Sequence, residues 1–316
     1  MIDLLKNPIF NDETAARKWL EARVWPEGPT CPHCGNASQG KITKLEGKAH
    51  RPGVFQCNEC REQFTVTVKT VFERSKIPLT KWLAALFLMT ASKKGVSAHQ
   101  VHRMLGVSYK STWFMMHRLR EAMRSGGLEP LGGRGKVVEA DETYFGRADE
   151  PRISKQRGDR PYKRPRKFNN RPILALVERG GSVRSFHVAV ADQATVCNIV
   201  RENVERETHV HTDESKLYVQ GLMDVRSHKR VKHTAKEYVR GDVTTNTVEN
   251  YFSVFKRGMR GVYQHCSEKH LHRYLAEFDF RYNNRSALGV GDAERASTLA
   301  AGIVGKRLTY RRPNQA

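Results

Sequence analysis

The chain has 316 residues, of which 39% are hydrophobic, and this is enough for two or three cores and too much for a basic tail. Its 55 lysines and arginines outnumber 33 acids, and the net charge of +22 favours a polyanionic partner such as nucleic acid. No apolar run approaches the roughly 18 residues of a membrane span. The first residues, MIDLLKNPIFNDE, lack the features of a signal peptide, so we expect a cytoplasmic protein with reduced cysteines. A ribosomal or merely soluble basic protein is the alternative that composition leaves open.

The first predicted element is a short amphipathic helix over residues 11–24, with Asn11 as its expected N-cap. A zinc ribbon is expected next, because two C-x2-C pairs follow with 22 residues between them. Each pair lets a tight turn direct two thiolates at one tetrahedral ion. The expected ligands of a structural zinc ion are Cys31, Cys34, Cys57 and Cys60. Two disulfides are the alternative, which a reducing compartment disfavours.

Residues 77–130 have the pattern of a helix-turn-helix domain. A first helix is expected to be capped by Thr80, and the turn Gly106-Val107-Ser108 separates two further helices. In this motif the N-terminal part of the last helix enters the major groove of DNA. The candidate DNA contacts are Tyr109, Lys110, Ser111, Phe114, His117 and Arg118. A three-helix core with no nucleic-acid role is the alternative, and the net charge and the neighbouring ribbon argue against it.

Beyond a glycine-rich linker at residues 125–133 the pattern changes from helical to strand-like. Strands are expected over residues 136–140, 172–177, 182–190, 208–212 and 229–234. Helical segments are expected over residues 195–206 and 215–222, and from about 246 and 267. Three consecutive strands followed by alternating helices and strands predict an α/β fold, an RNase H-like mixed sheet with flanking helices.

The predicted organisation has four parts. They are an N-terminal helix and zinc ribbon (1–76), a helix-turn-helix domain (77–130), an RNase H-like catalytic domain (131–290) and a C-terminal tail (291–316). Within the third part, residues 147–171 form an insertion with ten lysines or arginines against three acids and no apolar periodicity. We expect this insertion, including Lys163 and Arg164, to contact DNA phosphates, and a passive solvated loop is the alternative.

Three acidic residues stand where a two-metal site needs them: Asp141 and Asp213 follow strand-like runs, and Glu249 lies in a helical segment. Two divalent ions on one phosphate need carboxylates that converge from separate elements, and the first and fourth strands are neighbours in the expected sheet. Glu142 follows Asp141 on a strand, so we expect it to point to the opposite face and not to share the metals. This arrangement predicts phosphoryl-transfer chemistry on DNA.

Lys256 follows Glu249 by seven residues, which is two helical turns on the same face. With Arg257 and Arg260 it is expected to hold backbone phosphates. An ordinary basic helix face is the alternative for these three cations.

Together these motifs resemble the bacterial insertion-sequence transposases that join an N-terminal zinc ribbon to a DDE-type catalytic domain. The resemblance rests on CPHCG with CNEC, the helix-turn-helix pattern, ADETYFG, HTDES, TNTVENYFSVFKRG and EFDFRYNNR, in family order. It runs from about Phe10 to Arg285 and so covers nearly the whole chain.

The resemblance implies cleavage of double-stranded DNA at transposon ends with two Mg²⁺ or Mn²⁺ ions, followed by strand transfer into a target. It implies Asp141, Asp213 and Glu249 as the metal-binding triad, and a dimer or higher oligomer at the nucleoid DNA. Family members can carry asparagine at the third position, and Asn246 and Asn250 flank Glu249, so this ligand has alternatives. We favour Glu249 because an anion holds a hard cation better than an amide does. A catalytically inactive DNA-binding regulator and an RNase H-like or resolvase-type nuclease are the competing functions.

Overall fold

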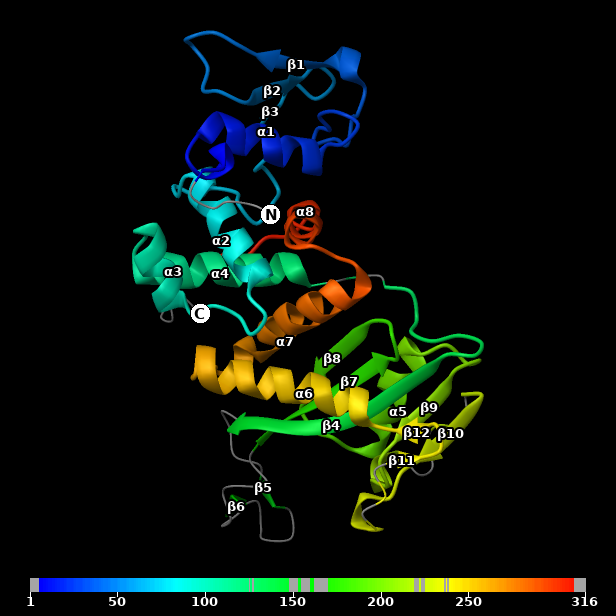
Figure 1. Cartoon of the computed structure of the whole chain (residues 1–316). Helices are drawn as coiled ribbons and strands as arrows, with labels where there is room; N and C mark the ends of the chain where they lie inside the picture. The colour runs from blue at the N-terminus through cyan, green and yellow to red at the C-terminus, as the bar shows by residue number, and fades with distance from the viewer. Residues whose placement is uncertain are drawn as a thin grey trace. The chain divides into compact units, whose positions relative to one another are not determined.

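The structure is a computed structural model, and it describes residues 6–124, 126, 128–147, 153–154, 160–161, 170–218, 222, 225–235, 237 and 239–309. The chain forms two compact units, one made of residues 1–124 with 289–316 and the other of residues 125–288. Each is described separately (Figure 1). Among the described residues, no helix is long and apolar enough to cross a membrane.

The first unit begins with α1 (Glu13–Val24) and a three-stranded antiparallel sheet. The strands are β1 (Ile42–Leu45), β2 (Val54–Cys57) and β3 (Gln63–Phe64). The predicted Asn11 cap of α1 is wrong by one residue: the carboxylate of Asp12 accepts the N–H groups of Thr14 and Ala15. A small apolar core closes the ribbon, consisting of Cys31, Ile42, Phe55, Cys57 and Phe64, with Trp25 packed against it.

The helical part of this unit has the predicted order of helices, α2 (Leu79–Ala91), α3 (Ala98–Leu105) and α4 (Tyr109–Met123). Gly106 ends α3 in the left-handed conformation at φ 60°, and the Ser108 hydroxyl caps α4. The predicted Thr80 cap of α2 is wrong. The helix already begins at Leu79, so Thr80 lies inside it, and Thr80 donates its N–H and hydroxyl to Glu13.

A further helix, α8 (Asp292–Ala301), belongs to the first unit, although no element was predicted after residue 290. It packs against α1 and α2. The Arg295 guanidinium, 7% exposed, donates to the carbonyl oxygen of Thr90 at 2.9 Å. This segment therefore contributes to the folded core of the helical part.

The second unit is built on a five-stranded sheet of order β10-β9-β4-β7-β8. The strands are β4 (Val137–Arg147), β7 (Asn170–Glu178), β8 (Val183–His187), β9 (His209–Thr212) and β10 (Ser227–Arg230). The first three pair antiparallel, and β9 and β10 join parallel to β4, which confirms the RNase H-like mixed sheet. The last strand lies slightly earlier than its predicted range of 229–234, because Ser227 to Arg230 align with β9.

Helices cover both faces of this sheet (Figure 1). On one face lie α6 (Asn246–Gly258) and α7 (Glu268–Asn283), and on the other lies α5 (Gln193–Asn203). Two pairs of short antiparallel strands are also present: β5 (Ile153–Ser154) with β6 (Arg160–Pro161), and β11 (Val239–Arg240) with β12 (Val243–Thr244). A π-helical segment, Met259–Tyr263, follows α6. Alternation along β4 divides its side chains, with Val138 and Ala140 in the α5 core and Phe145 in the α6 core.

Candidate active site

The four predicted cysteines form one cluster in the ribbon. One sulfur from each lies within 4.8 Å of the others, and all four thiols are free. The Sγ atoms of Cys31 and Cys60 are 3.6 Å apart, and those of Cys34 and Cys57 are 3.7 Å apart. Sulfurs bound at about 2.3 Å to a tetrahedral zinc ion lie roughly 3.8 Å from one another. The donor set therefore fits zinc, and these distances are far longer than a disulfide bond.

The crowded thiols shift one another's pKa values in opposite directions. Hydrogen bonds, first that from the backbone N–H of Cys60, lower the pKa of Cys57 to about 6, whereas the pKa values of Cys34 and Cys60 are raised. A thiol with a lowered pKa is a thiolate near neutral pH, which is the form that binds zinc.

The acidic site lies where β4 and β9 part. The two strands pair as far as Glu139 opposite His211, and β4 continues through Asp141 while β9 ends at Thr212. The prediction that Asp141 ends its strand is therefore wrong, because β4 extends to Arg147. Asp213, one residue beyond β9, accepts the N–H of Ser215 at 2.9 Å.

Asp141 and Asp213 come together as predicted, and Glu142 joins them. One carboxylate oxygen from each of the three lies within 4.8 Å of the others. The Glu142 carboxylate accepts hydrogen bonds from the hydroxyls of Tyr218 at 2.7 Å and Ser215 at 3.2 Å. The expectation that strand alternation keeps Glu142 away from the other acids is wrong. Beyond Glu139 the edge of β4 that faces β9 is no longer paired, although β7 still pairs with the other edge, and the loop that carries Asp213 and Ser215 lies at that open edge.

Burial and negative charge act together on this cluster. Burial, followed by the neighbouring charges of Glu142, Asp213 and Glu249, raises the pKa of Asp141 to about 8. Carboxylates that crowd in this way are stabilised by a bound cation. Oxygen donors are the ligands that Mg²⁺ and Mn²⁺ prefer, so the residues fit these ions.

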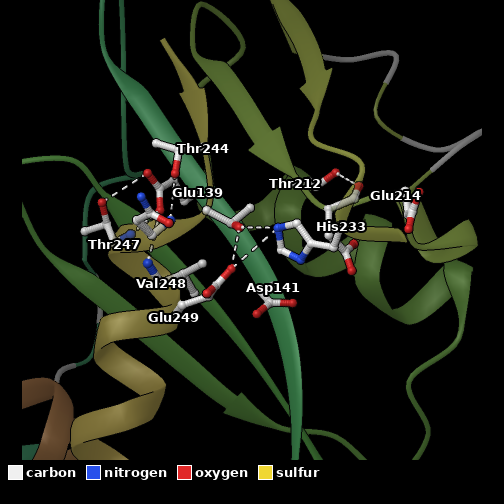
Figure 2. A network of polar contacts seen from close by, with 12 residues as sticks. Glu139, Asp141, Thr212, Glu214, His233, Thr244, Thr247, Val248 and Glu249 are labelled. Atoms are coloured by element: carbon white, nitrogen blue, oxygen red, sulfur yellow. Dashed lines mark hydrogen bonds and ion pairs between the residues drawn. The ribbon is translucent and has the colours of Figure 1, made fainter. Parts of the chain in front are cut away.

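Glu249 reaches the site from α6 and is not one of the three clustered acids. Its carboxylate is 44% exposed, accepts the Thr245 hydroxyl at 2.8 Å and lies 3.7 Å from Nε2 of His233 (Figure 2). His233 was not predicted to be near the site. The sequence placed it in a strand over residues 229–234, whereas it lies in a 3-10 turn between β10 and β11. Glu249 faces Asp141 across a groove.

That groove has a volume of about 790 Å³ and carries both signs of charge. Its lining is Asp141, Glu142, Thr143, Glu249, Phe252, Ser253, Lys256, Arg257, Arg260 and Gly261. Neither Asn246 nor Asn250 lines it, which favours Glu249 among the three neighbours. Burial lowers the pKa of Lys256, and the negative charge of Asp141 opposes that shift. Lys256 therefore interacts electrostatically with Asp141.

The predicted DNA contacts of α4 divide into two groups. Tyr109, Lys110 and Ser111 are exposed at the start of the helix, whereas His117 is buried and Phe114 is half-buried. Arg118 is 8% exposed, and its Nε donates to the carbonyl oxygen of Leu308 at 3.0 Å. This burial argues against a DNA contact by Arg118, and we leave it out of the proposed interface. Lys163 and Arg164 lie outside the described residues.

The comparisons with known proteins agree with this geometry. Residues 11–63 match the model of the transposase zinc-ribbon domain, and residues 130–283 match that of the ISXO2-like transposase domain, both of the IS1595 group. A protein of the transposable element ISH50 from Halobacterium salinarum is 30% identical over 291 residues, which is 86% of this chain and 91% of that protein.

A solved structure, the Mos1 transposase paired-end complex with left transposon end, aligns with 66% of this chain and 77% of its own at 11% identity. Its TM-score is only 0.20, so the assignment rests on the two domain models and the archaeal relative. The chain belongs to the ISXO2-like family of IS1595 transposases.

Proposed function

We propose that this transposase cleaves DNA at the ends of an insertion sequence and joins the freed ends to a target. One observation carries the proposal. Asp141 and Glu142 from β4 and Glu249 from α6 line a single groove together with three cations, and Asp213, from the loop after β9, clusters with Asp141 and Glu142. A catalytically inactive DNA-binding regulator would not need this arrangement, because DNA binding alone requires no convergent carboxylates.

In this proposal the acids hold two divalent ions. Bound Mg²⁺ or Mn²⁺ would activate the attacking water or 3′-hydroxyl and stabilise the leaving oxygen. Asp141 and Asp213 would hold one ion, Glu249 would hold the ion on the α6 side, and Glu142, which clusters with the two aspartates, would be a further ligand. No side chain acts as a covalent nucleophile.

The basic residues of α6 and the turn after it position the substrate. Lys256, Arg257 and Arg260 line the groove beside the acids, so they hold the phosphates that flank the scissile bond. At the start of α4, Tyr109, Lys110 and Ser111 are offered for contact with the end sequence in the major groove. The zinc-bound ribbon supports this binding, and a dimer or higher oligomer brings two ends together at the nucleoid.

The test uses the full chain and labelled DNA duplexes taken from both flanks of its gene, with Mg²⁺ or Mn²⁺. We expect metal-dependent cleavage and, with precleaved ends, a strand-transfer product. Cleavage should fall in each of three variants, Asp141→Asn, Asp213→Asn and Glu249→Gln, while DNA binding is retained. The fall should exceed the roughly 10–100-fold that follows when a residue supporting a metal ligand is changed. Asn250→Ala is the control and should cleave normally.

Each competing function has its own result in this assay. Cleavage without any strand-transfer product would identify a nuclease. Specific binding of the end duplexes without cleavage would identify a regulator. Cleavage that survives Glu249→Gln and is lost in Asn250→Ala would move the third ligand to Asn250.

A further inference from the structure

A buried glutamate lies beneath the proposed catalytic acids and is not one of them. Glu139 is on β4, two residues before Asp141 and on the same side of the strand, and its side chain is 0% exposed. A carboxylate this deeply buried is costly unless donors surround it. Four donors do so, and they come from α6 and from the turn after β7.

The first contacts of Glu139 are with the N-terminus of α6. Oε2 accepts the backbone N–H of Thr247 at 2.7 Å and of Val248 at 3.1 Å, and Oε1 accepts the Thr247 hydroxyl at 3.0 Å (Figure 2). These N–H groups are orphan donors at a helix start, which a capping side chain normally satisfies. The residue in the cap position, Thr245, makes no such bond and instead donates its hydroxyl to Glu249. Glu139 therefore caps α6 from a strand more than a hundred residues earlier in the chain.

The remaining contact of Glu139 links it, through Arg179, to β9. Arg179, in the turn after β7, donates from Nε to Glu139 at 2.6 Å. Its Nη2 donates to Nδ1 of His211 on β9 at 3.2 Å and to the carbonyl oxygen of Thr244 at 3.1 Å.

The three elements joined by this network are the three that carry the proposed metal ligands. Asp141 lies two residues after Glu139, Asp213 two after His211, and Glu249 two after Thr247. We propose that Glu139, with Arg179, is a positioning residue that fixes the start of α6 against β4 and β9 and so sets the spacing of the carboxylates across the groove. This inference rests on the proposed function, because it concerns the same metal site.

The test measures Mn²⁺ affinity of the full chain by calorimetric titration, with Asp141→Asn defining the signal of the active site. Glu139→Gln keeps the shape of the side chain but turns an NH2 group toward donors, so the cap and the arginine contact cannot both form. We expect its dissociation constant for Mn²⁺ to rise about 10–100-fold, as for other groups that orient metal ligands. Cleavage by this variant should recover as Mn²⁺ is raised.

Glu277 provides a matched control. It is also 0% exposed, is paired with Arg281 and lies on α7 of the same unit, but it is not among the residues that line the groove. Glu277→Gln should lower the urea midpoint of unfolding and leave the Mn²⁺ dissociation constant of the folded protein unchanged. A second, milder variant, Thr247→Val, removes one of the four donors and should raise the dissociation constant about two- to tenfold. It serves as the test if Glu139→Gln does not fold.

The outcomes separate this inference from the function on which it rests. If wild-type protein shows no Mn²⁺ binding that Asp141→Asn abolishes, the proposed function itself is wrong. If wild type binds and both Glu139→Gln and Thr247→Val match the affinity of Glu277→Gln, Glu139 is a structural residue only and the inference is wrong.

Discussion

The thiolate cluster and the carboxylate groove are both built to hold metal, but they gather their donors over very different stretches of chain. The four sulfurs come from two tight turns of one small antiparallel sheet, within residues 31–60. The acids come from β4, from the residue after β9 and from α6, which span residues 141–249. The first set needs only its own turns, and the second needs the whole mixed sheet to be folded.

This difference sets what each metal contributes to the fold. The ribbon has a core of a few residues around Phe55 and Phe64, too small to hold the sheet alone, so zinc binding and folding should be one event. The sheet of the second unit has large apolar cores on both faces. Its acids are held in place before any ion binds, through contacts such as that of Glu139 with α6.

The largest effect should follow from zinc removal. Cys57→Ser, or a chelator, should raise hydrogen exchange throughout residues 31–64 and weaken end binding, while the amides of β4, β7 and β8 keep their protection. Structural zinc supplies about 10–16 kcal/mol of apparent binding free energy in small zinc modules, and the ribbon has little to replace it. Unchanged protection in a zinc-free ribbon, checked by metal analysis, would contradict the four-thiolate assignment.

An intermediate effect is expected at Glu142. Glu142→Gln keeps the acceptor for Tyr218 but loses the charge that faces Asp141 and Asp213, so Mn²⁺ affinity should fall about 10–100-fold. Glu214→Gln is the control, because Glu214 follows Asp213 directly but turns its carboxylate to Thr234. Equal affinities in the two variants would return Glu142 to a structural role beside the site.

A smaller effect is expected at Lys256. Lys256→Ala should lower end cleavage more than total DNA binding, since many other cations share the non-specific attraction. The slope of log affinity against log salt should fall by about one unit, and Lys256→Arg should be partly tolerated. Lys269→Ala, an exposed lysine of α7 outside the groove, should leave cleavage unchanged. Normal cleavage with an unchanged slope in Lys256→Ala would make Lys256 part of an ordinary basic helix face.

The smallest effect distinguishes the two predicted cations of α4. Lys110→Ala should reduce the salt slope of end binding by about one unit without affecting stability, because Lys110 is exposed. Arg118→Ala should instead lower the free energy of unfolding by about 1–3 kcal/mol, since its bond to the Leu308 carbonyl oxygen is lost in a buried place. A lower salt slope in Arg118→Ala with unchanged stability would restore Arg118 as a DNA contact.

Features that depend on local spacing could be predicted from the sequence. The two C-x2-C pairs predicted the ribbon, and strand and helix periodicity predicted the order of the mixed sheet and the meeting of Asp141 with Asp213. A signal for Glu139 was present as well, because it stands between Val138 and Ala140 in the apolar start of the strand, and a glutamate is rarely buried without a partner. Its partners could not be read, since they lie in α6 and beyond β7.

Errors arose where tertiary contacts override a local rule. Strand alternation placed Glu142 away from Asp141, but β9 ends at Thr212 and the following loop brings Asp213 and Ser215 to that side of β4. Helix periodicity offered Arg118 to solvent, but residues near Leu308 cover it. Neither the end of a neighbouring strand nor the path of a distant segment is encoded in local spacing.

The central claim is that Asp141 and Asp213 share a metal ion at the point where β9 ends beside β4. It is tested most directly by a crystal structure of the protein with Mn²⁺ and end DNA, in which anomalous scattering locates the ions. We expect one peak about 2.0–2.2 Å from carboxylate oxygens of both aspartates, and a second, on the Glu249 side, bridged to it by a phosphate of the DNA. Peaks elsewhere in the groove, with neither aspartate within bonding distance, would contradict the assignment of these acids as the metal ligands.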